Sequence, residues 1–130
     1  MLFIDKEHLR FFNKKVAECK LLGRTDSQTS ALLYLLALTS ETRTHFEEIF
    51  NMKEGMIKPE SVKAGWQTGT TIKVSRLAFN LFNGYIYDNC GSDKVSRYYA
   101  VDDIFNCNLA MYFFEAIKLR YPEYFCKEDL

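Results

Sequence analysis

The 130-residue chain carries 17 basic and 17 acidic side chains, so its formal net charge is zero, and 48% of its residues are hydrophobic. This length predicts one domain, residues 1–130, with a sizeable core, and the balanced charge lacks the global field of a typical nucleic-acid or membrane-surface binder. The four cysteines form no CxxC pair and accompany only two histidines, which excludes the usual zinc patterns, so we expect reduced thiols and no disulfide.

The N-terminal residues predict a helix in a cytoplasmic protein. Met1 leads directly into Leu-Phe-Ile-Asp, without the basic and apolar regions of a signal peptide. Asp5 is a good N-cap and Gly23 a good helix end. One helical face carries four residues at the expected spacing: Leu9, Phe12, Val16 and Cys19. We interpret His8, in the first turn, as an exposed histidine without a chemical role.

The stretch from Ser30 to Leu38 is the expected centre of the fold. Apart from Ser30 and Tyr34 it consists of Ala and Leu, which are strong helix formers. A helix that is apolar on every side must be surrounded by other elements. Because the stretch is far shorter than the roughly 20 residues needed to span a bilayer, it predicts a buried central helix, capped by Thr25 or Asp26, and no membrane association.

A third helix is expected to begin at Ser40 and to run to about Phe50. Within it Glu41, His45 and Glu48 have the spacing i, i+4 and i+7, which could place three metal-ligand types on one face. Di-iron bundles need the Glu-x-x-His motif twice, and this chain has no second one. We interpret these residues as a solvated charged face and expect no metal.

The candidate binding surface surrounds the helix expected between Thr71 and Asn83, after a linker with a turn at Gly55 and a short helix beginning at Pro59. Thr70 or Thr71 is the expected N-cap and Gly84 the C-cap. The helix is apolar except for one polar line, and the glycines and threonines before it offer N–H groups to anions. The candidate partner- or anion-binding residues are Gln67, Thr68, Thr70, Thr71, Lys73, Arg76 and Asn80. The alternative interpretation is the ordinary wet edge of a core helix.

The last helix is expected over Val101–Tyr121, and the helix-poor sequence Asn106-Cys-Asn108 could split it. Pro122 should end it, with Tyr124 and Phe125 packed back on the core. Alternating apolar and polar residues are scarce, so we expect negligible strand content, with residues 85–87 as the one candidate. The fold class predicted for the chain is all-α: a compact single-domain bundle of five to seven helices around a buried central helix.

Two segments carry a resemblance to a known family. GWQTGTTIKVSRLAFNLFNG, from residue 65, and VDDIFNCNLAMYFFEAIKLRYPEY, from residue 101, are similar to sequences of a small family of unknown function. Members of that family occur in Firmicutes and in their phages and mobile elements. The resemblance implies a bacterial or phage setting and supplies no activity, cofactor or catalytic residue.

These observations favour a non-enzymatic binding protein without a cofactor. Its expected partner is a bacterial host protein, such as a defence or regulatory factor that it inhibits, and homodimerisation stays open. The first alternative is a DNA-binding regulator, because Val74-Ser-Arg-Leu77 with Asn83-Gly84 resembles the recognition helices of helix-turn-helix repressors. The turn between Gly65 and Thr71 is longer than the usual three or four residues of that motif. The second alternative is an enzyme without a recognisable local motif.

Overall fold

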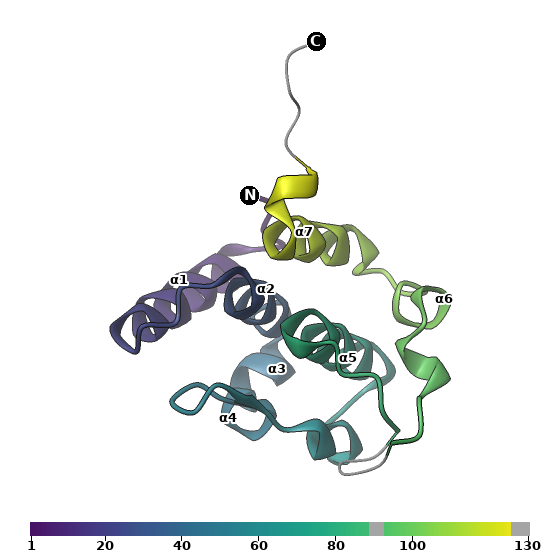
Figure 1. The fold of residues 1–130 in the computed structure, drawn as a ribbon. Helices are drawn as coiled ribbons and strands as arrows, with labels where there is room; N and C mark the ends of the chain where they lie inside the picture. Colours follow the sequence, from purple (N-terminus) through teal and green to yellow (C-terminus); the bar gives the residue numbers. More distant parts are fainter. Residues whose placement is uncertain (89–92, 126–130) are drawn as a thin grey trace.

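The computed structural model describes residues 1–88 and 93–125, and these form helices joined by short connections (Figure 1). The helices are α1 (Lys6–Leu21), α2 (Ser27–Leu36), α3 (Ser40–Thr44), α4 (Phe46–Ile49), α5 (Gly69–Asn83), α6 (Val101–Ile104) and α7 (Ala110–Arg120). The 3-10 helices are η1 (Pro59–Lys63), η2 (Arg97–Tyr99) and η3 (Pro122–Tyr124), and the strands are β1 (Phe50–Asn51) and β2 (Met56–Ile57). The prediction of a mainly helical domain is therefore confirmed.

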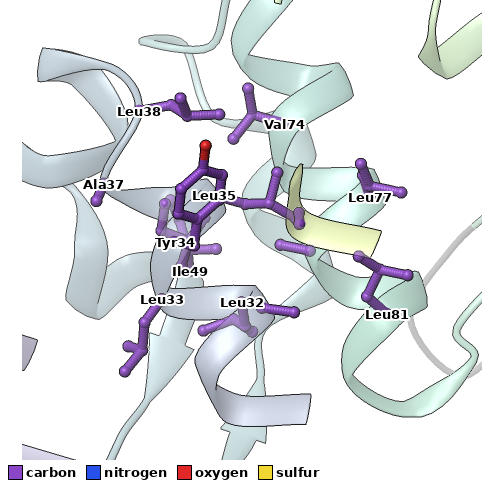
Figure 2. Close-up of a cluster of buried hydrophobic side chains, with 14 of the residues drawn as sticks. Leu32, Leu33, Tyr34, Leu35, Ala37, Leu38, Ile49, Val74, Leu77 and Leu81 are labelled. Carbon is purple, nitrogen blue, oxygen red and sulfur yellow. The ribbon is translucent and has the colours of Figure 1, made fainter. Parts of the chain in front are cut away.

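Helix α2 lies between α1 and α5, with α7 across its other side (Figure 1). Every residue from Ala31 to Leu38 is buried, as expected for a helix with apolar side chains on all faces. Figure 2 shows the side chain of Leu35 directed towards Val74 and Leu77 of α5. The aliphatic composition of α2 thus corresponds to its enclosure by three other helices.

The buried end of α2 is completed by side chains from neighbouring elements. The carbonyl groups of the last turn of a helix lack intrahelical partners and must be satisfied in another way. His8 Nε2 donates to the carbonyl oxygen of Tyr34 at 2.9 Å, and Thr42 Oγ1 donates to that of Leu36 at 2.8 Å. Arg43 donates to the carbonyl oxygen of Ala37 at 2.8 Å. Helices α1 and α3 therefore stabilise α2 through hydrogen bonds as well as through packing.

The interpretation of His8 as an exposed residue is wrong. Its side chain is fully buried, whereas Leu9 is partly exposed, so the inner face of α1 consists of His8, Phe12 and Cys19. Both ring nitrogens of His8 have partners, since Nδ1 also accepts from the Ile4 backbone N–H at 3.2 Å. A histidine with two satisfied nitrogens can be buried at little cost, so His8 takes the buried position that was expected for Leu9.

The helix expected from Ser40 to Phe50 is interrupted. Thr39, not Ser40, is the N-cap, and α3 ends at Thr44 before α4 begins at Phe46. Because the break falls at His45, Glu41 no longer shares a continuous helix with Glu48. His45 pairs with Glu48 and stacks on Trp66 at 4.3 Å between ring centroids. Within residues 1–88 and 93–125, no group of three His, Cys, Asp or Glu side chains could hold a metal ion.

The linker expected after this helix contains a short antiparallel hairpin. Phe50 pairs with Ile57 and Asn51 with Met56, around the predicted turn at Gly55, where φ is +67°. The Arg24 guanidinium donates to the carbonyl oxygens of Met52 and Lys53, at 2.9 Å each. A Cβ atom on residue 55 would lie 2.3 Å from Arg24 Nη1. The positive φ therefore favours glycine here, and a side chain would also displace the Arg24 guanidinium.

The predicted C-terminal helix is divided into α6 and α7, as the sequence between Asn106 and Asn108 suggested. The prediction that Tyr124 and Phe125 pack on the core is wrong, because they are 77% and 51% exposed. Phe113 and Ala116 of α7 already fill the space above α2. An isolated bridge joins Tyr87 to Val95, next to the expected strand at residues 85–87.

The cysteines that can be described, Cys19 and Cys107, are free thiols. Cys90 and Cys126 lie outside the described residues. Among the helices of the described part of the chain, none combines the length and the apolar character needed to cross a membrane.

Candidate functional site

The predicted binding surface is built on α5, which is held at both ends. The N-cap is Thr68, two or three residues earlier than expected, and its side chain accepts from the Thr71 N–H at 3.1 Å. The Thr71 hydroxyl in turn accepts from the Thr68 N–H at 2.7 Å, which completes a capping box. Gly84 ends the helix with φ of 78°, as predicted. Both helix ends are therefore defined by local hydrogen bonds.

The three predicted threonines, Thr68, Thr70 and Thr71, line one hollow of about 340 Å³ together with Glu41 and Asn108. Thr71 is buried and its hydroxyl is used in the capping box, so it offers nothing to a ligand. The structure brings these threonines together, but their described hydrogen bonds serve the start of α5.

Gln67, the first residue of the predicted surface, is directed inward. Its side-chain nitrogen donates to the carbonyl oxygen of Ser61 and to the hydroxyl of Ser75, at 3.2 Å each. Gln67 thereby joins η1 to the middle of α5, and it is a structural contact in this arrangement.

The polar line of α5 is half-buried under parts of residues 85–88 and 93–106. Lys73 Nζ donates to the carbonyl oxygen of Asn106 at 2.8 Å, and Asn80 Nδ2 donates to that of Tyr85 at 3.3 Å. The Arg76 guanidinium carbon lies 4.9 Å from the centroid of the Tyr98 ring. Lys73, Arg76 and Asn80 thus share one face as predicted, and each fastens the following segment to α5.

Replacing Thr68 by alanine is expected to lower the free energy of unfolding by about 1 kcal/mol, because loss of an N-cap side chain exposes an unsatisfied N–H. Urea denaturation followed by circular dichroism measures this change. The matched control is Thr70→Ala, since the Thr70 side chain has no part in the capping box. Equal losses in the two variants would contradict the structural role of Thr68.

An arginine–tyrosine cluster, formed by Arg76, Arg97 and Tyr98, lies beside this covered face. Arg76 is one of the residues predicted from the sequence, whereas Arg97 and Tyr98 are not. The Arg97 guanidinium carbon is 5.1 Å from the Tyr98 ring centroid, and Arg97 Nη2 donates to the Tyr98 hydroxyl at 3.3 Å. That hydrogen bond raises the pKa of Arg97, so its charge is retained. Neither arginine has a carboxylate within ion-pair distance among the described residues. The cluster therefore offers two cations beside an aromatic ring.

A second feature, the α6–α7 strip, consists of Val101, Phe105, Met111 and Phe114. Val101, Met111 and Phe114 are 71%, 59% and 58% exposed. The rings of Phe105 and Phe114 lie 5.1 Å apart, and Met111 precedes Phe114 by one helical turn. Scattered exposed apolar side chains are normal, whereas a continuous group of them marks an interaction site.

The sequence match agrees with the earlier resemblance. The DUF6075 family, described as a family of unknown function, matches residues 1–130. The chain belongs to the DUF6075 family. No curated protein and no solved structure matches it. Membership of DUF6075 confirms that the chain is part of an uncharacterised family, and any function must be inferred from the residues themselves.

A sequence signal for the α6–α7 strip did exist in this DUF6075 member. Met111 and Phe114 fall outside the apolar stripe of α7, which leads to the buried Phe113 and Ala116. Large apolar residues on the polar side of an amphipathic helix are candidates for a binding surface. Tyr98 could not be found in this way, because its neighbour Arg76 comes from a distant part of the chain.

Proposed function

We propose that this protein is a non-enzymatic binding protein whose partner is another protein. The proposed setting is the cytoplasm of a bacterium, where the protein is encoded by a phage or mobile element. The proposed target is a host defence or regulatory factor, which the protein inhibits. The proposed contact surface is the α6–α7 strip together with the arginine–tyrosine cluster and Lys73.

The observation that carries this proposal is an exposed apolar strip beside two arginines that have no ion-pair partner within residues 1–88 and 93–125. Val101 lies one residue beyond η2, which carries Arg97 and Tyr98, and Lys73 binds the carbonyl oxygen of Asn106 next to Phe105. Phenylalanine, tyrosine, methionine and arginine are the residue types enriched at protein interfaces. The apolar side chains favour a partner with its own apolar patch, and the arginines favour an acidic rim around that patch.

A recognition surface is also expected to lie on secondary-structure elements that caps and packing hold in place. Helix α5 is capped at both ends, and Arg76 lies against both Tyr98 and Tyr99. Burial raises the pKa of Tyr99, with the charge of Arg76 acting in the opposite direction, so this tyrosine stays neutral beneath the guanidinium. The proposed surface is thus ordered before a partner arrives, which reduces the entropy cost of binding.

Duplex DNA is the second candidate partner, because unpaired guanidiniums also suit phosphates. A recognition helix must project into the major groove, whereas α5 packs on α2 with its buried side, and its polar line is bonded to Tyr85 and Asn106. DNA would therefore have to bind through Arg76 and Arg97 at the edge of α5. A mobility shift that survives physiological salt and is lost in Arg76→Ala would favour DNA over a protein partner.

The test compares proteins captured from a bacterial host lysate by the wild type and by a Met111→Asp/Phe114→Asp variant. We expect the variant to lose the specific partner, with Kd rising at least about 30-fold in titration calorimetry, since central apolar contacts contribute about 2 kcal/mol or more. Arg76→Glu should weaken binding at least about tenfold. It should cost no more than about 1 kcal/mol of stability, the scale of a cation–π contact.

The matched control is Leu21→Asp, because Leu21 is 89% exposed at the far end of α1. This variant carries the same kind of change as Phe114→Asp and should bind like the wild type. A partner that is captured equally well by the Met111→Asp/Phe114→Asp variant would contradict the proposed surface.

A further inference from the structure

A groove runs along α1 on the side that faces α3, α4 and the β1–β2 hairpin. Three consecutive hollows, of about 350, 290 and 350 Å³, share lining residues. Counted from the start of α1, the first and second hollows share Arg43 and Thr44. The second and third hollows share Phe46 and Glu47. On the α1 side the lining passes from Glu7 through Lys15 to Leu22 just beyond the helix end. The hollows therefore form one α1 groove as long as the helix.

The floor of the α1 groove is apolar and aromatic. Phe46 and Phe50 are buried beneath it, and Leu22 and Met52 form part of the wall near the hairpin. Lys15 Nζ lies 4.7 Å from the centroid of the Phe46 ring and 5.4 Å from that of Phe11. Because Lys15 is already paired with Glu18 at 3.1 Å, this part of the groove offers an apolar hollow beside two aromatic rings, which can receive an apolar side chain.

The walls of the α1 groove carry an excess of positive charge in a protein whose net charge is zero. The basic lining residues are Arg10, Lys14, Lys15, Arg43, Lys53 and Lys58, against the acidic Glu7, Glu47 and Glu48. Glu7 is already paired with Arg10, Glu48 with His45, and the basic Lys15 with Glu18. Lys14, Lys53 and Lys58 take part in no ion pair within the described residues. The groove is therefore electrostatically complementary to an acidic ligand.

The length of the groove identifies the form of that ligand. Helix α1 has 16 residues, which correspond to about 24 Å at a rise of about 1.5 Å per residue. A second helix of similar length would place apolar residues at i, i+4, i+7 and i+11 over the successive hollows. The β1–β2 hairpin, with only two residues in each strand, is too short to recruit an extended peptide by edge pairing.

We propose that the α1 groove is a docking site for an acidic amphipathic helix of a partner protein. Its aliphatic residues enter the hollows over Phe11, Phe46 and Phe50, and its carboxylates approach Lys14, Lys53 and Lys58. This site is separate from the surface proposed above, because α1 and α6 lie on opposite sides of the α2–α5 pair (Figure 1). The two proposals can therefore fail independently.

The test uses two fluorescein-labelled synthetic helical peptides of about 18 residues with leucine at i, i+4, i+7 and i+11. Glutamate occupies the polar positions in one peptide and lysine in its twin, so the pair differs only in charge. Fluorescence anisotropy against the full chain should show the acidic peptide binding at least about tenfold more tightly than the basic twin. Equal binding of the two peptides, or no binding of the acidic one, would overturn the proposal.

Variants locate the peptide on the protein. Lys14→Glu/Lys58→Glu should weaken binding of the acidic peptide at least about tenfold and should improve binding of the basic twin. Lys20→Glu/Lys118→Glu is the matched control, since it makes the same change of net charge at exposed residues outside all three hollows. Thr44→Trp should block the junction of two hollows and abolish binding. An equal loss in the control would show a general charge effect and would refute the groove.

The same assay separates this inference from the protein-binding function proposed for the α6–α7 strip. The Met111→Asp/Phe114→Asp variant should bind the acidic peptide like the wild type, because neither residue lines the α1 groove. Loss of peptide binding in this variant would place the peptide on the α6–α7 strip instead and would overturn the groove assignment. Circular dichroism of each variant establishes that the fold is retained.

Discussion

Leu35→Ala is expected to lower the free energy of unfolding by about 3–5 kcal/mol, the range for a fully buried leucine. Leu35 has no exposed surface and lies in the last turn of α2, directed towards Val74 and Leu77 of α5 (Figure 2). The rigid helices on either side of α2 cannot collapse into the space that the side chain leaves. Domains of this size have a total stability of only about 5–15 kcal/mol, so the variant should be marginally folded.

The matched control for this substitution is Leu21→Ala. Leu21 is also a helical leucine, at the end of α1, but it is 89% exposed. Its truncation should change stability by no more than about 0.5 kcal/mol, as is usual for surface substitutions. Urea denaturation of both variants followed by circular dichroism measures the difference. Similar losses for the two leucines would contradict the central position of α2.

The position of the helices could be predicted well where local chemistry decides it. Asp5 and Asp26 accept from N–H groups of their own first turns, and Gly84 adopts the left-handed conformation that ends α5. The apolar run from Ala31 to Leu38 is buried throughout, because no polar face exists that could be turned to water. These features depend on residues that are neighbours in the sequence.

Features that depend on distant residues could not be predicted in this way. His8 is buried because the carbonyl oxygen of Tyr34 lies opposite its ring, and no periodicity within α1 contains that information. The break at His45 accompanies the stacking of its ring on Trp66, which lies beyond the hairpin in the chain. The hairpin strands have two residues each, too few to produce an alternating pattern.

The candidate surface shows the same division between local and distant information. The spacing of Lys73, Arg76 and Asn80 correctly placed them on one face of α5, because helical periodicity is local. The residues that cover this face lie within 85–88 and 93–106, and they are held there by hydrogen bonds to Tyr85 and Asn106 and by the Tyr98 ring. Polar side chains that could bind a partner can therefore instead hold two parts of the same chain together. The arginines at the edge of α5, Arg76 and Arg97, are the better candidates for binding a partner.

Acidification is expected to destabilise the protein through His8. The carbonyl oxygen of Tyr34 can only accept, and the Ile4 N–H can only donate, so His8 is a neutral ring with its proton on Nε2. Protonation of Nδ1 would place two N–H groups against each other and would bury a charge. Burial lowers the pKa of His8 below its usual 6.5, with the repulsion of Arg43 adding to it, while the hydrogen bond to Tyr34 and the charge of Asp5 act in the opposite direction.

The sign of the effect follows from linkage. Because the pKa of His8 is lower in the folded chain than in the unfolded chain, the unfolded chain binds the proton first. The contribution of His8 to stability is complete above pH 6.5, the ordinary histidine value, and is lost as the pH falls towards the folded-state pKa. In that window the free energy of unfolding should fall by up to about 1.4 kcal/mol per pH unit.

Urea denaturation at several values between about pH 5 and pH 7.5 measures this slope. His8 also helps to hold the N-terminal segment through Tyr34. The two rings pack with centroids 4.6 Å apart, and the Tyr34 hydroxyl donates to the carbonyl oxygen of Leu2 at 2.6 Å. In His8→Gln the amide nitrogen can still reach the Tyr34 carbonyl, so we expect a less stable protein with a flatter pH profile. The matched control is His45→Gln, which removes the half-exposed second histidine and leaves His8 and its two hydrogen bonds in place. A slope that persists in His8→Gln would show that the proton binds elsewhere.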